Sequence, residues 1–314
     1  MRITNNTMTN NFLTSLNKSL QRESKLQEQL ADGKNIHRPS DDPIKAVRSL
    51  RYNTSLALNT QYTRNAQDAQ SWMQTSDTAM QDLSSIMNSI KEKVVQASNG
   101  TNPQDAVQAI GADVDGLINQ IVNLGNTKVG DRYVFAGQKD KTTPFTRVGD
   151  VITYNGDANK ISMPIQPGVV SPSQDSVNLT GQDVFGRGIA PDSVTGLVTG
   201  TSILNDLIAI KQHLQSGTTA DQQWLSNTGL STLDADHSQM LQSHTQLGSR
   251  MSMYEMAQNM MENNNTTINQ DLANNDDLDI TKAITDLKTN ETVYQTALQA
   301  GAKIMQKSLA DFLS

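Results

Sequence analysis

One helical stripe constrains the fold of this 314-residue chain more than any other feature. Between residues 62 and 97, apolar or small side chains recur at alternating spacings of four and three, with a single polar member. A period of 3.5 residues kept over this length is typical of a coiled-coil seam and not of a globular helix face. The members of this stripe are Tyr62, Ala66, Ala69, Met73, Ser76, Met80, Leu83, Met87, Ile90, Val94 and Ala97.

Capping residues predict where the helices of the first half begin and end. Asp42 and Pro43 suit the N-cap and the first position of a helix over residues 43–98, and Asn99-Gly100 suits its end. Within this helix, Ser76-Asp77 is the expected place for a break. A second apolar stripe, opened by a proline and closed by a glycine, predicts a helix over residues 103–125. Its members are Val107, Ile110, Val114, Leu117, Ile121 and Leu124.

The same spacing returns after residue 200. A short helix is predicted over residues 203–214, and the four-three pattern then runs from Leu233 to Leu272. A cluster of Asn and Asp over residues 274–277 marks a turn, after which Asp279 or Thr281 opens a last helix.

The region between these helical halves has a different composition. Five of the eight prolines fall between residues 131 and 200, together with many of the glycines. β-Rich fragments lie between turn signals, at residues 133–135, 151–154 and 161–163. We therefore predict a small β-rich insert that projects from the far end of the helical part.

The predicted fold class is mainly α: an elongated coiled-coil helical bundle formed by the N- and C-terminal segments, with a small β-rich inserted domain. Only 36% of the residues are hydrophobic and 4% aromatic, which suits narrow apolar seams better than compact globules. We divide the chain into terminal helices that pair on assembly (1–38 and 276–314), a helical rod domain (39–130 and 201–275) and the β-rich insert (131–200).

The two ends of the chain carry half-filled stripes, which cannot bury enough surface to hold an isolated helix. Residues 1–38 carry six basic and three acidic side chains, whereas residues 263–314 carry four basic and seven acidic ones, so the two ends have opposite charge. We expect each end to be ordered only against a partner and to form an assembly interface. The candidate interface residues are Phe12, Leu16, Leu26 and Leu30 in the N-terminal helix, and Leu287, Tyr294, Leu298, Met305, Leu309 and Phe312 in the C-terminal helix.

Charge and cysteine content exclude several classes of function. The net charge is −7 without a run of like charges, so neither nucleic acid nor membrane insertion is expected. No cysteine is present, which excludes disulfides and thiolate chemistry. The first ten residues lack the apolar core of a cleavable signal, so a chain that leaves the cell is not expected to use the general secretory route.

Few residues are candidates for chemistry. His237 and His244 are seven apart on one helix, about 10 Å from each other, too far to share a metal without other ligands. The aspartates of residues 271–279 lack the glycine and the closing glutamate of a calcium loop, so helix capping explains them better. We therefore predict no catalytic residue, metal or cofactor. Six methionines over residues 240–261 fit either core filling or a partner surface.

Eight segments carry motifs that recur together in one family: residues 1–5, 29–36, 39–43, 64–65, 130–137, 247–251, 294–298 and 308–313. These motifs resemble the flagellin superfamily and, within it, the hook-filament junction family of hook-associated protein 3 type. Together they cover roughly the first 140 and the last 75 residues. A flagellin-type Asn-Ser/Ala-x-Asp-Asp-Ala segment is replaced here by Pro39-Ser40-Asp41-Asp42-Pro43, which favours the junction family over flagellin.

This resemblance implies a structural, non-enzymatic subunit of the bacterial flagellum. The implied partners are hook-associated protein 1, flagellin, copies of the chain itself in a ring, an export chaperone on the C-terminal helix and the type III export apparatus. The implied location is extracellular, at the hook-filament junction, after export without a cleaved signal peptide. A flagellin-like filament subunit and a secreted coiled-coil interaction protein are the alternatives.

Overall fold

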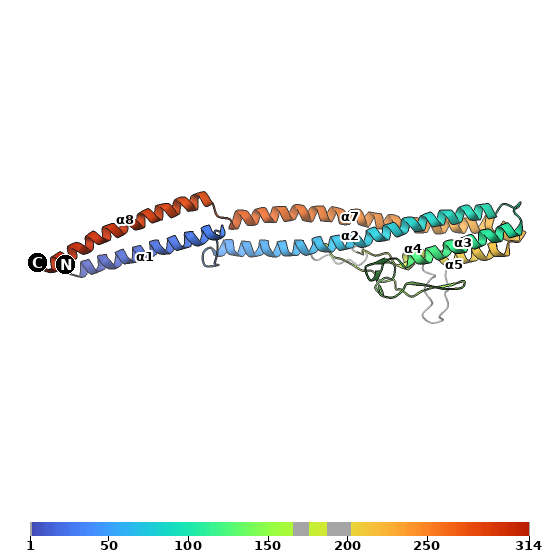
Figure 1. The fold of residues 1–314 in the computed structure, drawn as a ribbon, viewed down its shortest axis with the longest axis horizontal. Helices are drawn as coiled ribbons and strands as arrows, with labels where there is room; N and C mark the ends of the chain where they lie inside the picture. Colours follow the sequence, from blue (N-terminus) through green and yellow to red (C-terminus); the bar gives the residue numbers. More distant parts are fainter. Residues whose placement is uncertain (1, 166–175, 187–201, 314) are drawn as a thin grey trace. The chain divides into compact units, whose positions relative to one another are not determined.

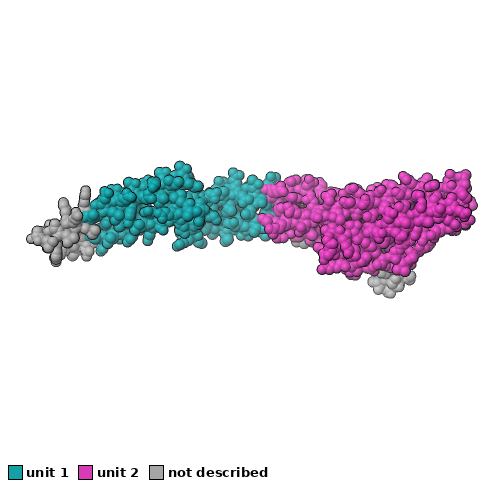
Figure 2. Space-filling view, viewed as in Figure 1, with its two compact units in different colours: residues 1–59, 263–314 teal, residues 60–262 magenta. Residues whose placement is uncertain are grey.

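The computed structural model describes residues 2–165, 176–186 and 202–313. Contacts divide the chain into two units: unit 1, residues 1–59 with 263–314, and unit 2, residues 60–262 (Figure 2). These divisions fall inside two long helices, whereas the sequence places its boundaries at 38/39 and 275/276. The division into terminal helices, rod domain and insert therefore stays a prediction.

Long helices dominate both units, and the mainly α fold class with a small β part is confirmed (Figure 1). The β part is two short antiparallel hairpins. The helices of the described residues are α1 (Arg2–Asp32), α2 (Pro43–Ala97), α3 (Gln104–Gly125), α4 (Gly181–Phe185), α5 (Ile203–Ser216), α6 (Thr219–Trp224), a π-helical turn (Leu225–Gly229), α7 (Leu230–Asp276) and α8 (Ile280–Leu313).

The predicted seam of α2 forms the centre of unit 2. From Ala66 to Ala97, each of its members is at most 1% exposed, including the polar Ser76. The seam of α7 is buried with the same period: Leu233, Met240, Leu247, Tyr254 and Met261, seven residues apart, are at most 2% exposed. A repeat of seven keeps one face of a helix turned toward its neighbour over many turns.

The expected break in α2 is wrong, because α2 is continuous from Pro43 to Ala97. The Ser76 hydroxyl donates to the carbonyl oxygen of Trp72, one turn earlier, at 2.9 Å. This local bond satisfies a serine that is wholly buried in the seam, so the polar residue does not interrupt the helix.

Close packing of α3 on α5 shifts the buried stripe of α3. Ile118 and Val122 are buried, whereas the predicted seam members Leu117 and Leu124 are only partly so. A Cβ at Gly111 would lie 3.1 Å from the Leu214 side chain, so these two helices approach closely at this glycine. Because α3 packs on more than one neighbour, a single four-three stripe does not describe its burial.

The β part is smaller than predicted. β1 (Lys128–Val129) pairs with β2 (Arg132–Tyr133), and β3 (Phe145–Val148) pairs with β4 (Val151–Tyr154). The fragment over residues 161–163 forms no strand and contributes only an isolated bridge from Ser162 to Ser176. Residues 166–175 and 187–201 of the predicted insert lie outside the described residues.

The β3–β4 hairpin packs on α3 and does not project away from the helices as we expected. A Cβ at Gly125 would lie 2.7 Å from the Phe145 ring, so the ring covers the end of α3. Arg147 and Lys211 bind the carboxylates of Asp115 and Asp150, which ties the hairpin to α3 and α5. Four aromatic residues of the insert thus belong to the same core as the helix seams: Phe135, Phe145, Tyr154 and Phe185.

In unit 1, the capping predictions are confirmed. The Asp42 carboxylate accepts from the backbone N–H of Ile44 and Lys45 at 3.1 and 3.0 Å, at the start of α2. The Asp279 carboxylate accepts from the backbone N–H of Lys282 at 3.0 Å, at the start of α8. Each aspartate satisfies helix N–H groups that have no partner within the helix.

Candidate assembly interface

Helices α1 and α8 lie side by side and run in opposite directions within unit 1 (Figure 1). Three points of contact fix their register: Phe12 with Gly301, Ser19 with Asn290, and the N–H of Leu278 bonded to the Gly33 carbonyl at 2.9 Å. The two ends of the chain, which the charge pattern predicts as partners, therefore form one antiparallel helical hairpin.

A glycine in α8 makes room for the largest side chain of the seam. A Cβ at Gly301 would overlap the ring of Phe12, so the ring sits directly over the glycine backbone. An aromatic residue that fills the space above a small residue is a knob-into-hole contact. In the sequence, Gly301 is only a gap in the apolar stripe, and sequence reasoning misses this role.

A polar pair occupies the centre of the hairpin. The Ser19 hydroxyl donates to the side-chain oxygen of Asn290 at 2.9 Å, and the Asn290 amide donates to the Ser19 carbonyl at 2.9 Å. Both side chains are thereby satisfied, although they lie in a seam that is otherwise partly apolar. A reciprocal polar pair of this kind favours one register over its apolar competitors.

The structure places the candidate interface residues in three groups. Phe12, Leu16, Leu26, Leu30, Leu287 and Tyr294 are all partly buried in the α1–α8 seam. Leu298 lies outside the seam and is 44% exposed. Met305, Leu309 and Phe312 lie in α8, but their side chains are outside the described residues. No seam residue of α1 named here is fully buried, so the hairpin keeps apolar surface in contact with solvent.

One side of the hairpin is apolar. We define the hairpin flank as Leu13, Leu20, Ile284 and Leu298, which are 48%, 42%, 48% and 44% exposed. Each of these residues directly follows a seam residue of its own helix. In an antiparallel pair of helices, the residues that come directly after seam residues lie on the same side of both helices. The contacts between α1 and α8 described above bring Leu13 level with Leu298. The flank is an unpartnered apolar surface in the single chain.

The end of α7 is bonded both to the loop that follows α1 and to the first turns of α2. The N–H of Asn35 donates to the carbonyl of Asp276 at 2.7 Å, and the Ser49 hydroxyl donates to the Asp276 carboxylate at 2.6 Å. Gly33 has a φ of +68°, a conformation that favours glycine, at the end of α1. The pKa of Asp41 is lowered by its bond to Lys25, at 2.8 Å, and by backbone N–H groups.

Catalytic arrangements are absent from the described part of unit 2. The His237 ring nitrogen lies 2.8 Å from the Ser84 hydroxyl, and the His244 ring nitrogen lies 2.7 Å from the Asp77 carboxylate. Burial, together with the charge of Lys91, lowers the pKa of His237. These contacts join α2 to α7 and are the packed coiled-coil positions that the spacing predicts.

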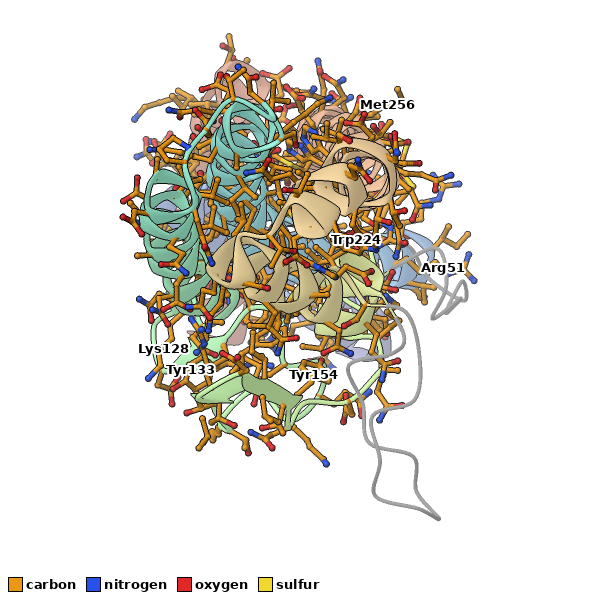
Figure 3. The ribbon with its side chains drawn as sticks, turned by 90° about the vertical axis from the view of Figure 1, so that its right-hand side faces the viewer. Arg51, Lys128, Tyr133, Tyr154, Trp224 and Met256 are labelled. Atoms are coloured by element: carbon orange, nitrogen blue, oxygen red, sulfur yellow. The ribbon has the colours of Figure 1, made fainter. Side chains whose placement is uncertain are left out.

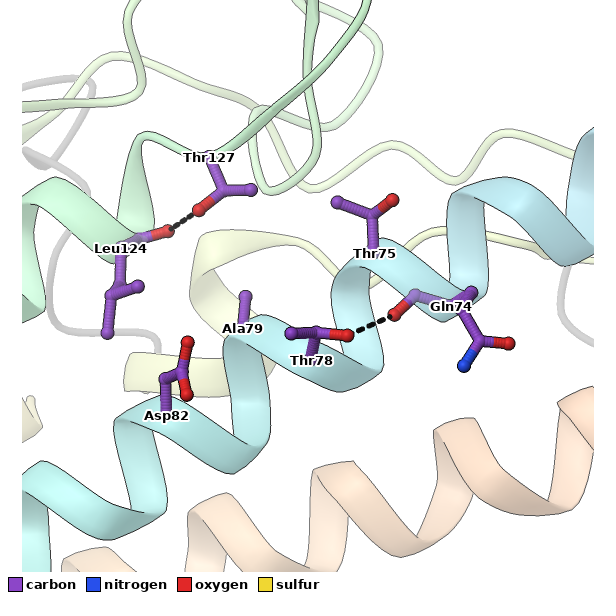
Figure 4. Close-up of a pocket in the computed structure, with 7 residues that line it drawn as sticks. All are labelled: Gln74, Thr75, Thr78, Ala79, Asp82, Leu124 and Thr127. Atoms are coloured by element: carbon purple, nitrogen blue, oxygen red, sulfur yellow. Dashed lines mark hydrogen bonds between the residues drawn. The ribbon is translucent and has the colours of Figure 1, made fainter.

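A polar groove lies between α2 and α3 (Figure 4). Its volume is about 230 Å³. Two of its hydroxyls, those of Thr78 and Thr127, donate to the helix backbone and are not directed at a ligand. Its lining residues are Gln74, Thr75, Thr78, Ala79, Asp82, Leu124 and Thr127, which form no nucleophile-base pair.

One carboxyl group in unit 2, that of Asp236, is buried. Asp236 of α7 is 9% exposed, and its Oδ2 atom has no hydrogen-bond partner among the described residues. Burial, together with the negative charge of Asp206, raises the pKa of Asp236 to about 7. Over the described residues, no group of three acidic or histidine side chains could hold a metal ion, and no helix is long and apolar enough to span a membrane.

Comparison with known proteins agrees with this architecture. Residues 3–140 match the bacterial flagellin N-terminal helical region. The chain is 34% identical to flagellar hook-associated protein 3 of Escherichia coli over 142 residues, which are 45% of this chain and 44% of that protein. It is 25% identical to flagellin of Bacillus subtilis over 306 residues, which are 95% of this chain and 94% of that one.

The fold is shared with solved structures. The crystal structure of the flagellar junction protein FlgL from Legionella pneumophila superposes with a TM-score of 0.57 at 15% identity, over 74% of this chain and all of that one. The match of residues 3–140 to the flagellin N-terminal region and the identity to hook-associated protein 3 each span less than half of the chain. These similarities support a protein of the flagellin superfamily, of the hook-associated protein 3 type.

Proposed function

We propose that this chain is a structural, non-enzymatic subunit of the flagellum that joins the hook-associated ring to the flagellin filament. The observation that carries the proposal is the α1–α8 hairpin, whose seam is only partly buried and whose flank exposes four large apolar side chains. Such a surface gains burial from neighbouring subunits, which is how a chain of this kind is held in an assembly.

The relatives support the finer parts of the proposal. The Escherichia coli relative is named a flagellar hook-associated protein, and the Legionella one is named a flagellar junction protein. By this likeness the partners are hook-associated protein 1 on one side, flagellin on the other and copies of the chain in a ring. An export chaperone would cover α8 before assembly, and export would use the type III apparatus without a cleaved signal.

Assembly of purified protein tests the proposal. Light scattering and negative-stain microscopy would follow a concentration series, alone and with hook-associated protein 1 and flagellin. We expect a chain that stays monomeric alone and joins both partners. No association in any mixture would contradict the proposal.

A matched pair of variants locates the interface. Leu298→Asp places a charge on the hairpin flank, and we expect it to reduce incorporation at least about tenfold, since one desolvated charge costs more than about 1.4 kcal/mol. Leu241→Asp is the control, because Leu241 is 43% exposed on α7 in unit 2, close to the 44% of Leu298. Equal incorporation of both variants would exclude the flank as an interface.

A filament subunit of flagellin type is the second candidate. The observation in its favour is the alignment with Bacillus subtilis flagellin, which covers nearly the whole of both chains. A filament subunit would form long fibres from the purified chain alone, whereas a junction subunit would require its partners. The same concentration series therefore distinguishes the two candidates.

A further inference from the structure

The dipeptide Asn-Gly occurs twice in this chain, at residues 99–100 and at residues 155–156. An asparagine followed by glycine is prone to deamidation, because the glycine nitrogen can attack the side-chain amide and glycine has no side chain in the way. The first dipeptide lies in the loop between α2 and α3, and the second includes the two residues after β4. The two copies share their chemistry and differ in their surroundings, so they can be compared within one molecule.

Deamidation needs water and releases ammonia. The glycine nitrogen loses its proton to solvent and forms a bond to the Cγ atom of asparagine, and the side-chain nitrogen takes up a proton and leaves as ammonia. The resulting succinimide ring is opened by water at one of its two carbonyl carbons. One opening gives aspartate, and the other gives isoaspartate, in which the main chain runs through the β carbon.

The side chain of Asn99 is held by its oxygen. Its Oδ1 atom accepts from the Thr101 hydroxyl at 3.0 Å and from the Thr101 backbone N–H at 3.4 Å. These bonds close a turn that contains the Gly100 nitrogen, and they polarise the amide carbonyl toward attack. The Nδ2 group, which must leave, has no hydrogen-bond partner in the described part of the chain. Asn99 and Gly100 are exposed, and a Cβ at Gly100 would meet nothing within 4 Å.

The side chain of Asn155 is held by its nitrogen instead. Its Nδ2 group donates to the Thr146 hydroxyl at 3.2 Å and to the Thr143 carbonyl at 3.4 Å. Both bonds must break before ammonia can leave. The glycine that follows is enclosed, since a Cβ at Gly156 would overlap the ring of Tyr154, which is 3% exposed (Figure 3). Leaving group and nucleophile are therefore both restrained at this second site.

We propose that Asn99 is a site of spontaneous deamidation and that the fold protects Asn155 from the same reaction. The inference goes beyond the proposed function and does not depend on it. The product adds a negative charge just after the C-terminal end of α2, where the helix carbonyls already carry partial negative charge. Isoaspartate also lengthens the main chain at residue 99, whose carbonyl accepts from the Asn102 N–H at 3.0 Å. Both changes weaken the loop and the last turn of α2.

Mass spectrometry of the aged protein measures both sites in one sample. The purified chain would be kept at mildly alkaline pH and digested at acidic pH, and each peptide scored for a gain of one mass unit. We expect Asn99 to react at least about tenfold faster than Asn155 in the folded chain. In guanidinium chloride the two rates should agree within about threefold, because the surroundings that distinguish the sites are lost. Equal rates in the folded chain, or a faster Asn155, would overturn the inference.

Three variants test the features of the two sites. Gly100→Ala hinders the attacking nitrogen and should slow the reaction of Asn99 about tenfold; the fold accepts it, because φ of Gly100 is not positive and the new Cβ meets nothing. Thr101→Val removes the hydroxyl bond to Oδ1 and should slow Asn99 about threefold. Thr146→Val is the matched control, since it frees Nδ2 of Asn155 and should accelerate that site about threefold. If neither valine variant changed its rate, the fold would not govern the two sites, and the inference would be wrong.

Discussion

Two seams in this chain follow the same heptad spacing and reach different degrees of burial. In unit 2, the α2 seam from Ala66 to Ala97 is at most 1% exposed at each position. In unit 1, the α1–α8 seam is only partly buried at Phe12, Leu16, Leu26 and Leu30. The number of neighbours explains the difference, because helices α3, α5 and α7 and the insert contribute to the core around α2, whereas α8 is the main neighbour of α1 among the described residues.

This difference suggests that the two seams have different roles: one stabilises the folded chain, and the other packs against further helices. A seam that is fully buried by its own chain supplies folding stability before any partner is present. A seam between two helices that includes polar residues cannot supply this stability alone. Its remaining apolar surface is buried only when further helices pack against it. The comparison therefore predicts that equal truncations in the two seams have unequal effects on the free chain.

The largest expected effect is the loss of one leucine from each seam. Leu83→Ala, at a position that is 0% exposed, should lower the free energy of unfolding of unit 2 by about 2–5 kcal/mol. Leu26→Ala, at a half-buried position, should cost about 1 kcal/mol or less in the free chain. Urea unfolding followed by circular dichroism measures both. Equal losses would show that the hairpin is a core of the same kind as unit 2.

The heptad spacing predicts the helices and their caps well, for a physical reason. Burial in a coiled coil depends on position along one helix, so the sequence of α2 or α7 alone contains the pattern. The missed features depend on a second element. Gly301 is a hole only because Phe12 lies opposite, and Asn290 is satisfied only by Ser19.

The insert was predicted less well because its contacts are distant in sequence. Phe145 covers Gly125, and Arg147 binds Asp115, so contacts with α3 fix where the paired strands lie. Short strands with irregular turns give a weak local signal, and nothing in that signal indicates which helix face they cover. The exposed side of the candidate interface was also missed: Leu298 follows the stripe by spacing but lies beside the seam.

The second largest expected effect is a difference between the two units in how their stability depends on pH. The pKa of Asp236 in unit 2 is raised to about 7, above the value of about 3.9 for an unfolded aspartate. Its contribution to stability is therefore present below about pH 4 and is lost as the pH rises through 7, because the folded state must then bury a charge. The pKa of Asp41 in unit 1 is lowered instead, so its contribution is lost on acidification.

Asp236→Asn keeps the side chain neutral at every pH. We expect it to raise the free energy of unfolding of unit 2 by about 1–3 kcal/mol at pH 8 and to have little effect at pH 4. Asp234→Asn is the control, since Asp234 lies two residues away and its side chain is 54% exposed. Denaturant titrations at the two pH values measure the difference, and a gain that is equal at both would contradict the assignment to burial.

The smallest effect tests whether the hairpin seam is packed in the free chain at all. Alanine is favoured over glycine in a helix by about 1 kcal/mol, so Gly301→Ala should stabilise α8 if nothing lies opposite. In the structure, the added Cβ would overlap the Phe12 ring, and the ring must turn away. We therefore expect Gly301→Ala to be neutral or destabilising by up to about 1 kcal/mol in the unmodified chain, and stabilising in a Phe12→Ala background. Hydrogen exchange of α8 amides measures the sign in each background. A stabilising effect in both backgrounds would mean that Phe12 does not pack on Gly301 in the free chain. The α1–α8 seam would then be unpacked before assembly, whereas the α2 seam is packed in the single chain.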